Sequence, residues 1–146
     1  MKAFACAFRG IFSSLWRERH MRIHFCFAFY VIVCGFVCSI AAWEWAACLI
    51  CIGGVTALEC INTAIEDMCD ELHPEKSPGI GRAKDAAAGA VLCMAIASAA
   101  VGAVIFFRAE RVAALAEFFK SVPAAAVMFG VTVPVWIIYI FGRKHK

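Results

Sequence analysis

Four polar side chains recur toward the end of an apolar stretch of the sequence, and their spacing could support metal and phosphate chemistry. They are Glu59, Asn62, Glu66 and Asp70. Because they stand three or four residues apart, a helix would place them within an arc of roughly 80°. Carboxylates crowded on one face repel each other unless cations intervene, and oxygen ligands of this type suit magnesium. The pattern therefore predicts a magnesium site able to hold the β- and γ-phosphates of ATP.

A loop with glycines and basic residues follows this acidic face. It contains Gly79, Gly81, Arg82 and Lys84, shortly before the next apolar stretch. Backbone N–H groups at a helix start, together with cations, could bind an anion. The signal is weak by itself. The sequence has no G-x-x-x-x-G-K-[ST] motif and no protein-kinase signature set, which excludes a soluble nucleotide-binding fold.

The elements that must position these groups are four long apolar runs. The chain has 146 residues, of which 64% are apolar and 17% charged, whereas a soluble domain is about 45–50% apolar. Each run matches the roughly 20 residues that cross a bilayer, and each is apolar all round. Pro134 interrupts the last run and makes it the weakest. The runs are residues 23–42, 45–68, 86–107 and 122–141.

Basic residues predict how these helices are oriented. With the N-terminus inside, the outer segments hold only Arg108, Arg111 and Lys120 of the 14 Lys and Arg residues. That asymmetry favours an even number of crossings with both termini on the cytoplasmic side. We therefore expect a multi-pass protein of the bacterial inner (cytoplasmic) membrane. The net charge of +3 is too small and scattered to indicate nucleic acid as a partner.

The segments outside these runs predict surface helices and a second carboxylate of interest. Residues 1–22 place Phe4, Phe8 and Phe12 at helical spacing with polar residues between them, which predicts an amphipathic helix on the inner membrane surface or packed on other helices. The outer stretch 108–120 is a candidate for another. Glu18 precedes the first run, and it could complete a metal site with Glu66 or pair with neighbouring arginines.

Depth in the membrane separates Glu59 from the other acidic residues. It should lie about two turns inside the inner boundary, where a carboxylate is costly unless it is paired or wetted. It is therefore a functional candidate, with a salt-bridged structural glutamate as the alternative. The pairs Cys48/Cys51 and His20/His24 have metal-ligand spacing, but no second pair accompanies either, so we interpret neither as a metal or redox site.

The acidic block and the basic loop together resemble the small prokaryotic diacylglycerol kinase family, which includes undecaprenol kinases. The resemblance rests on Glu59-x-x-Asn62-Thr63-Ala64-Ile65-Glu66, then Asp70, then Gly81-Arg82-Ala83-Lys84-Asp85 and Ala88-Gly89-Ala90-Val91. It extends without apparent gaps from about residue 7 to residue 107. It implies an all-α integral membrane bundle, with residues 23–107 as a three-span core, 1–22 as the surface helix, and 108–146 as an addition carrying a fourth, peripheral helix.

The resemblance also implies an activity and roles for individual residues. It implies a homotrimer with composite active sites that transfers the ATP γ-phosphoryl group to a lipid hydroxyl. Glu59 would be the general base, and Glu18 and Glu66 would hold Mg²⁺. Asn62, Asp70 and Arg82 would support them, and Arg22 would join Glu59 in contacting the lipid. The nucleotide would contact Glu18, Glu66, Glu75, Lys76, Ser77, Lys84 and Asp85.

The resemblance is less specific about the substrate and the nucleotide contacts. Many relatives have a longer N-terminal segment with an arginine that reaches the nucleotide, and this sequence starts too late to supply it. The run from Arg17 to His24 and the pair Asn62-Thr63 are similar to the undecaprenol kinase branch, which favours undecaprenol over diacylglycerol. A membrane transport or structural subunit with Glu59 in an ion path is the remote alternative, disfavoured because polar residues stop near the inner third of the second helix.

Overall fold

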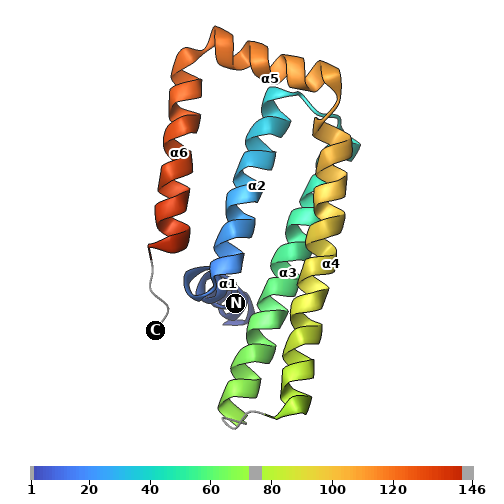
Figure 1. Cartoon of the computed structure of the whole chain (residues 1–146), viewed down its shortest axis with the longest axis vertical. Coiled ribbons are helices and arrows are strands. Elements are labelled where there is room, and N and C mark those ends of the chain that lie inside the picture. The colour runs from blue at the N-terminus through green and yellow to red at the C-terminus, as the bar shows by residue number, and fades with distance from the viewer. Residues whose placement is uncertain (1, 73–76, 143–146) are drawn as a thin grey trace.

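The computed structural model describes residues 2–72 and 77–142, and this part of the chain is helical throughout apart from short connections. No strand occurs within these residues, so the expected all-α fold is confirmed. Two ends of the bundle are distinguished below: the α1 end, where the surface helix lies, and the α5 end opposite it (Figure 1). The helices are α1 (Lys2–Arg17), α2 (Arg19–Val37), α3 (Ala42–Leu72), α4 (Pro78–Phe106), α5 (Ala109–Ser121) and α6 (Pro123–Phe141).

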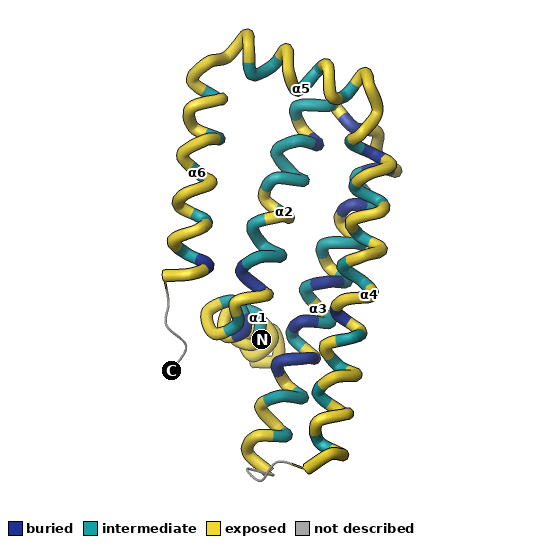
Figure 2. The backbone as a smooth tube through the Cα atoms, viewed as in Figure 1, coloured by how far each residue is buried: buried dark blue, intermediate teal, exposed yellow. Residues whose placement is uncertain are grey.

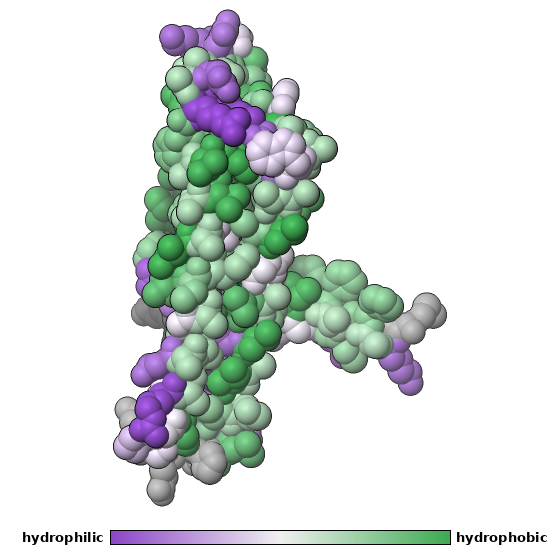
Figure 3. Space-filling model, turned by 90° about the vertical axis from the view of Figure 1, so that its right-hand side faces the viewer, coloured by the Kyte–Doolittle hydropathy of each residue, from purple (hydrophilic) through white to green (hydrophobic). Residues whose placement is uncertain are grey.

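Four of the described helices, α2, α3, α4 and α6, are long and apolar enough to cross a membrane. Most of their outward surface is exposed (Figure 2), including large apolar side chains such as Ile50, which is 70% exposed. Such a surface is stable against lipid rather than water. Polar side chains gather toward the two ends of the bundle, with an apolar belt between them (Figure 3). The prediction of a multi-pass membrane bundle is therefore confirmed.

The N-terminal helix is shorter than the expected surface segment of residues 1–22. It ends at Arg17, because Glu18 has an extended backbone with φ −91° and ψ 127° that breaks the helix. Arg19 already begins α2, so residues 19–22 belong to the first spanning helix. α1 projects sideways from the bundle (Figure 3) and leaves Phe4, Phe8 and Phe12 exposed along one side. That apolar side suits the membrane surface.

The two longest helices pack against each other, and short polar caps set where they begin. α3 and α4 lie antiparallel over most of their length (Figure 1). α3 begins after a turn in which Ser39 has a positive φ of 47°. The side chain of Ser77 accepts a hydrogen bond from Ile80 N at 3.3 Å and so caps α4, which Pro78 then starts. Pro at the first helical position costs no hydrogen bond there.

The last helix is continuous despite its internal proline. α6 runs through Pro134, so the fourth span is present although the residue weakened its prediction. It packs against α2 and α5 and lies on the side of α2 away from α3 (Figure 1). The Tyr30 hydroxyl lies 3.0 Å from Thr132 Oγ1, and the rings of Tyr30 and Phe129 are 4.7 Å apart.

Candidate active site

The four polar residues of the acidic face lie on one helix and become more exposed toward its end. All belong to α3. Glu59 is 3% exposed and Asn62 is 9% exposed, whereas Glu66 is half-buried and Asp70 is exposed. Asn62 Nδ2 donates a hydrogen bond of 2.9 Å to Glu66 Oε1. The face therefore runs from the buried Glu59 to the exposed Asp70. The Asn62 amide fixes the orientation of the Glu66 carboxylate, one turn later in the helix.

The Glu59 carboxylate meets a side chain from the neighbouring helix. Its Oε1 atom lies 3.2 Å from Nε2 of His24, which belongs to α2. The His24 side chain is 24% exposed, so the contact lies between the helices rather than on the surface. The hydroxyl of Thr63, one turn after Glu59, donates a hydrogen bond of 2.9 Å to the Glu59 backbone carbonyl. That bond leaves the Glu59 side chain unaffected.

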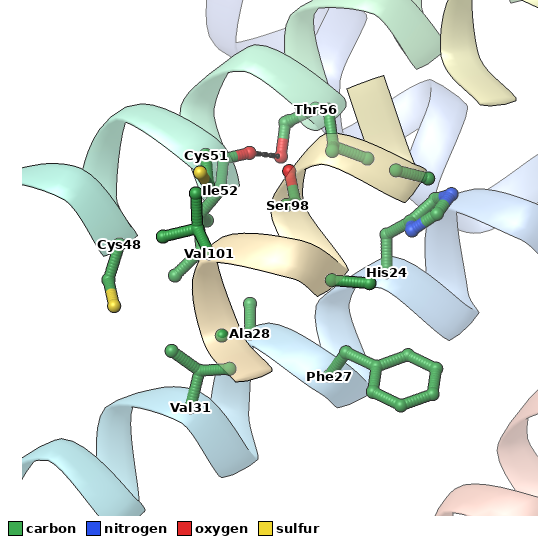
Figure 4. A pocket seen from close by; sticks show the side chains of 14 residues that line it. His24, Phe27, Ala28, Val31, Cys48, Cys51, Ile52, Thr56, Ser98 and Val101 are labelled. Carbon is green, nitrogen blue, oxygen red and sulfur yellow. Dashed lines mark hydrogen bonds between the residues drawn. The ribbon is translucent and has the colours of Figure 1, made fainter. Parts of the chain in front are cut away.

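An apolar pocket of about 270 Å³ adjoins this contact. It is lined by residues of α2, α3 and α4, with His24 at one end and Cys48 at the other (Figure 4). Its hydroxyl groups are turned to their own helices: Thr56 donates to Ile52 O and Ser98 to Met94 O, both at 2.8 Å. The pocket therefore offers an apolar wall to a ligand, with an imidazole at one end.

A bidentate ion pair ties the end of α1 to α3. The Arg17 guanidinium donates to both carboxylate oxygens of Asp67, at 2.6 and 2.9 Å. These hydrogen bonds raise the pKa of Arg17 above its ordinary value. Arg17 precedes Glu18 and Asp67 follows Glu66. The pair thus brings the two segments with the expected metal ligands to the same part of the bundle.

Lys84 connects the described part of the basic loop to the acidic face. Lys84 Nζ lies 2.6 Å from Asp70 Oδ1 and so joins the start of α4 to the end of α3. Arg82 and Asp85 are exposed, and the Ser77 hydroxyl is used as the cap of α4. Glu75 and Lys76 lie outside the described residues. The structure therefore brings Lys84 to the acidic face and leaves Arg82 and Asp85 at the surface.

Comparisons with known proteins match this arrangement to a family. The profile described as "Prokaryotic diacylglycerol kinase" matches residues 5–106, which is most of the chain. The chain belongs to the prokaryotic diacylglycerol kinase family. It is also similar to the undecaprenol kinase of Bacillus subtilis (strain 168), with 40% identity over 105 residues, covering 72% of this chain and 85% of that protein. No solved structure matches the chain.

Membership of the diacylglycerol kinase family makes this chain a membrane lipid kinase, a phosphotransferase with ATP as its co-substrate. The matched residues cover the acidic face, the basic loop and the pocket. They end at the close of α4. Both α5 and α6 therefore lie beyond the part of the chain that the family profile describes.

Arg22, which the resemblance assigns to lipid binding, is almost completely covered in this kinase. Its side chain is 1% exposed, and neither Nε nor Nη1 has a hydrogen-bond partner in the described structure. The Tyr139 ring of α6 lies 5.7 Å from the guanidinium carbon. Nearby, Arg19 lies 4.2 Å from the centre of the Phe141 ring. Two aromatic residues from outside the family match thus cover the basic start of α2.

The residues that the structure describes do not by themselves form a metal site in this kinase. Among the residues that the structure describes, no group of three His, Cys, Asp or Glu side chains could hold a metal ion. The donor chemistry nevertheless suits magnesium, because Glu66 offers carboxylate oxygens and the neighbouring Asn62 Oδ1 is buried with no hydrogen-bond partner. A buried carbonyl oxygen without a donor is costly and fits an environment that supplies a further ligand.

Two features of this kinase cannot be predicted from the spacing of residues in its sequence. One is the contact between His24 and Glu59, which depends on how α2 packs against α3. The other is a buried ion pair at the α5 end, where Glu44 is 0% exposed and meets Arg111 at 2.7 Å and Arg108 at 3.7 Å. The only available signal was a charged residue between Trp43 and Trp45, because its partners stand more than 60 residues away.

Proposed function

We propose that this chain is an undecaprenol kinase, which transfers the γ-phosphoryl group of ATP to the terminal hydroxyl of undecaprenol at the cytoplasmic membrane interface. The similarity to the undecaprenol kinase of Bacillus subtilis supports this substrate. The observation that carries the mechanism is Glu59, a carboxylate only 3% exposed that contacts His24, which in turn lines an apolar pocket. A long isoprenoid chain fits an apolar wall, and a hydroxyl at its end requires a base.

Glu59 serves as that base. The lipid hydroxyl transfers its proton to the Glu59 carboxylate while its oxygen forms the new bond to the γ-phosphorus. The bond between that phosphorus and the ADP oxygen breaks, and ADP leaves with the electron pair. Burial in a water-poor site keeps the carboxylate close to the hydroxyl and limits competition from water.

The more exposed part of the acidic face handles the nucleotide. Glu66 and Glu18 would hold Mg²⁺, whose positive charge would stabilise the phosphates during the transfer. Asn62 orients Glu66 through the hydrogen bond of 2.9 Å. Asp70 and Arg82 support the phosphate side. Direct nucleotide contacts come from Glu75, Lys76, Ser77, Lys84 and Asp85.

The active site is composite and forms in a homotrimer. Two kinds of observation support this proposal. The described residues of one copy do not gather three metal-binding side chains, and the buried atoms Asn62 Oδ1 and Arg22 Nε have no hydrogen-bond partner. A neighbouring subunit or a bound substrate would supply partners to both, since native proteins rarely leave such atoms unpaired.

The protein lies in a bacterial inner membrane, and the α1 end of the bundle faces the cytoplasm. α1 and the end of α6 lie at this same end (Figure 1), as four crossings require. The acidic face also becomes exposed toward this end, where ATP would enter. A C-terminal reporter active outside the cytoplasm would contradict this orientation.

The decisive experiment incubates the purified protein in lipid bilayers with γ-labelled ATP, magnesium and either undecaprenol or diacylglycerol. We expect label on undecaprenol at a rate at least about tenfold above that on diacylglycerol. A preference for diacylglycerol would replace the proposed substrate with the other lipid of the family. Label on neither lipid would refute the proposed function. Glu71→Gln, an exposed carboxylate of the same helix, is the matched active control.

A further inference from the structure

The contact between His24 and Glu59 stands out because it joins the proposed base to a second polar side chain inside the apolar part of the bundle. The two atoms, His24 Nε2 and Glu59 Oε1, are 3.2 Å apart. The glutamate is 3% exposed and the histidine 24%. His24 also lines the apolar pocket. One imidazole therefore touches both the carboxylate and the space that a lipid chain would occupy.

The other polar side chains that line the pocket are poor hydrogen-bond donors for the Glu59 carboxylate. The hydroxyls of Thr56 and Ser98 already donate to carbonyls of their own helices. Cys48 and Cys51 offer only thiols, which are weak hydrogen-bond donors. Among the pocket-lining residues that the structure describes, His24 thus has the one strong side-chain donor beside the base.

We propose that His24 is the positioning residue for Glu59, an inference that rests on the proposed kinase function. Its Nε2–H group holds Oε1 of Glu59 and turns Oε2 toward the end of the pocket, where the lipid hydroxyl arrives. The proton then passes from the hydroxyl to Oε2, as in the reaction above, and His24 exchanges no proton with the substrate.

The physical need for such a residue follows from the surroundings of Glu59. A buried carboxylate without a donor is costly and rotates toward whatever polar group it can reach. A base that is displaced by an ångström loses much of its effect, because the reacting atoms must meet at bonding distance. A fixed imidazole donor on the adjacent helix both stabilises the buried carboxylate and fixes its position. Its loss should therefore lower kcat more than it weakens nucleotide binding.

Three substitutions of His24 test this role in the complete protein. His24→Leu removes the donor, and we expect kcat for the lipid to fall about 10- to 100-fold while KM for MgATP stays within about twofold. His24→Gln keeps an N–H donor at nearly the distance of Nε2, and we expect it to retain at least about a third of the activity. His24→Asn is too short and should behave like the leucine variant. His20→Leu, an exposed histidine one turn earlier, is the matched control.

Each outcome separates this inference from the proposed function. Wild-type protein that phosphorylates no lipid refutes the function, whatever the variants do. Active wild-type protein with equal kcat in His24→Leu and His20→Leu overturns the positioning role alone. A purely structural role is the finding if all three His24 variants lose kcat and melting temperature together. Equal activity in the asparagine and glutamine variants overturns the assignment of Nε2 as the donor.

Discussion

The helix α3 carries two buried carboxylates in different surroundings, and the contrast separates a structural acid from the proposed base. Glu44, near the α5 end, is fully buried and accepts hydrogen bonds from Arg111 at 2.7 and 2.9 Å and from the backbone N–H of Ala41 at 2.8 Å. Glu59 is nearly as buried but meets a single histidine beside a pocket. Three hydrogen bonds hold the Glu44 carboxylate in place, whereas the contact with His24 engages only Oε1 of Glu59, the proposed base.

The surroundings of Glu44 also explain how the C-terminal addition is held. Arg111 lies in α5 and donates as well to the carbonyl of Ile105 at the end of α4, at 3.0 Å. Its hydrogen bonds to Glu44 raise the pKa of Arg111. One buried carboxylate therefore fastens the start of α3 to α5, beyond the residues that match the family profile.

The largest effect is expected when the reactive acid loses its charge. Glu59→Gln removes the base but keeps the size of the side chain, so kcat for lipid phosphorylation should fall by about 10²- to 10⁴-fold. Binding of MgATP, measured by titration calorimetry, should change less than about threefold, and the melting temperature should not fall. A variant with more than a tenth of wild-type kcat would show that Glu59 is not the base.

The next effect concerns the nucleotide end of the same helix. Glu66→Gln removes a proposed metal ligand, and we expect the KM for MgATP to rise about 10- to 100-fold and the magnesium requirement to increase. Asp70→Asn serves as the comparison, because Asp70 is exposed and pairs with Lys84, and its KM should change less than about fivefold. An unchanged magnesium dependence in Glu66→Gln would contradict its assignment.

Loss of the structural acid should give the opposite pattern to loss of Glu59. Glu44→Gln leaves Arg111 and Arg108 without their buried acceptor, so we expect the melting temperature in detergent to fall by roughly 5 °C or more. The kcat of the folded fraction should stay within about twofold of wild type. Glu110→Gln, an exposed glutamate of α5, is the control. Equal melting temperatures in the two variants would remove the distinction between the two buried acids.

The smallest effect is expected at the exposed ion pair between Arg17 and Asp67. Because the pKa of Arg17 is raised, its contribution is complete below the ordinary arginine pKa and is lost only as the pH rises through the raised value. Mildly alkaline pH should therefore leave this pair intact. Salt should weaken it, because both side chains are exposed and their charges are screened. Arg17→Ala should change the KM for MgATP less than about fivefold, since exposed pairs contribute about 1 kcal/mol or less. A larger rise in the KM for MgATP at low salt would show that the pair controls the placement of Glu18.

Sequence patterns predicted the helices and much of the acidic face because both depend on local order. The four apolar runs and the three- to four-residue spacing from Glu59 to Asp70 depend on neighbours along one helix. The surface helix was placed too far, to residue 22, because the break at Glu18 depends on its backbone conformation. The pairing of Lys84 with Asp70 across a loop also depends on how α3 and α4 pack.

By itself, the sequence determined that this is a multi-pass helical membrane protein with acidic residues along one helical face, since periodicity and apolar length are local properties. Only the tertiary structure decided which partner each buried acid has. Arg111 reaches Glu44 from 67 residues away, and His24 reaches Glu59 from another helix. Such partners are chosen by helix packing, which brings distant residues within a few ångströms and leaves no mark in their spacing along the chain.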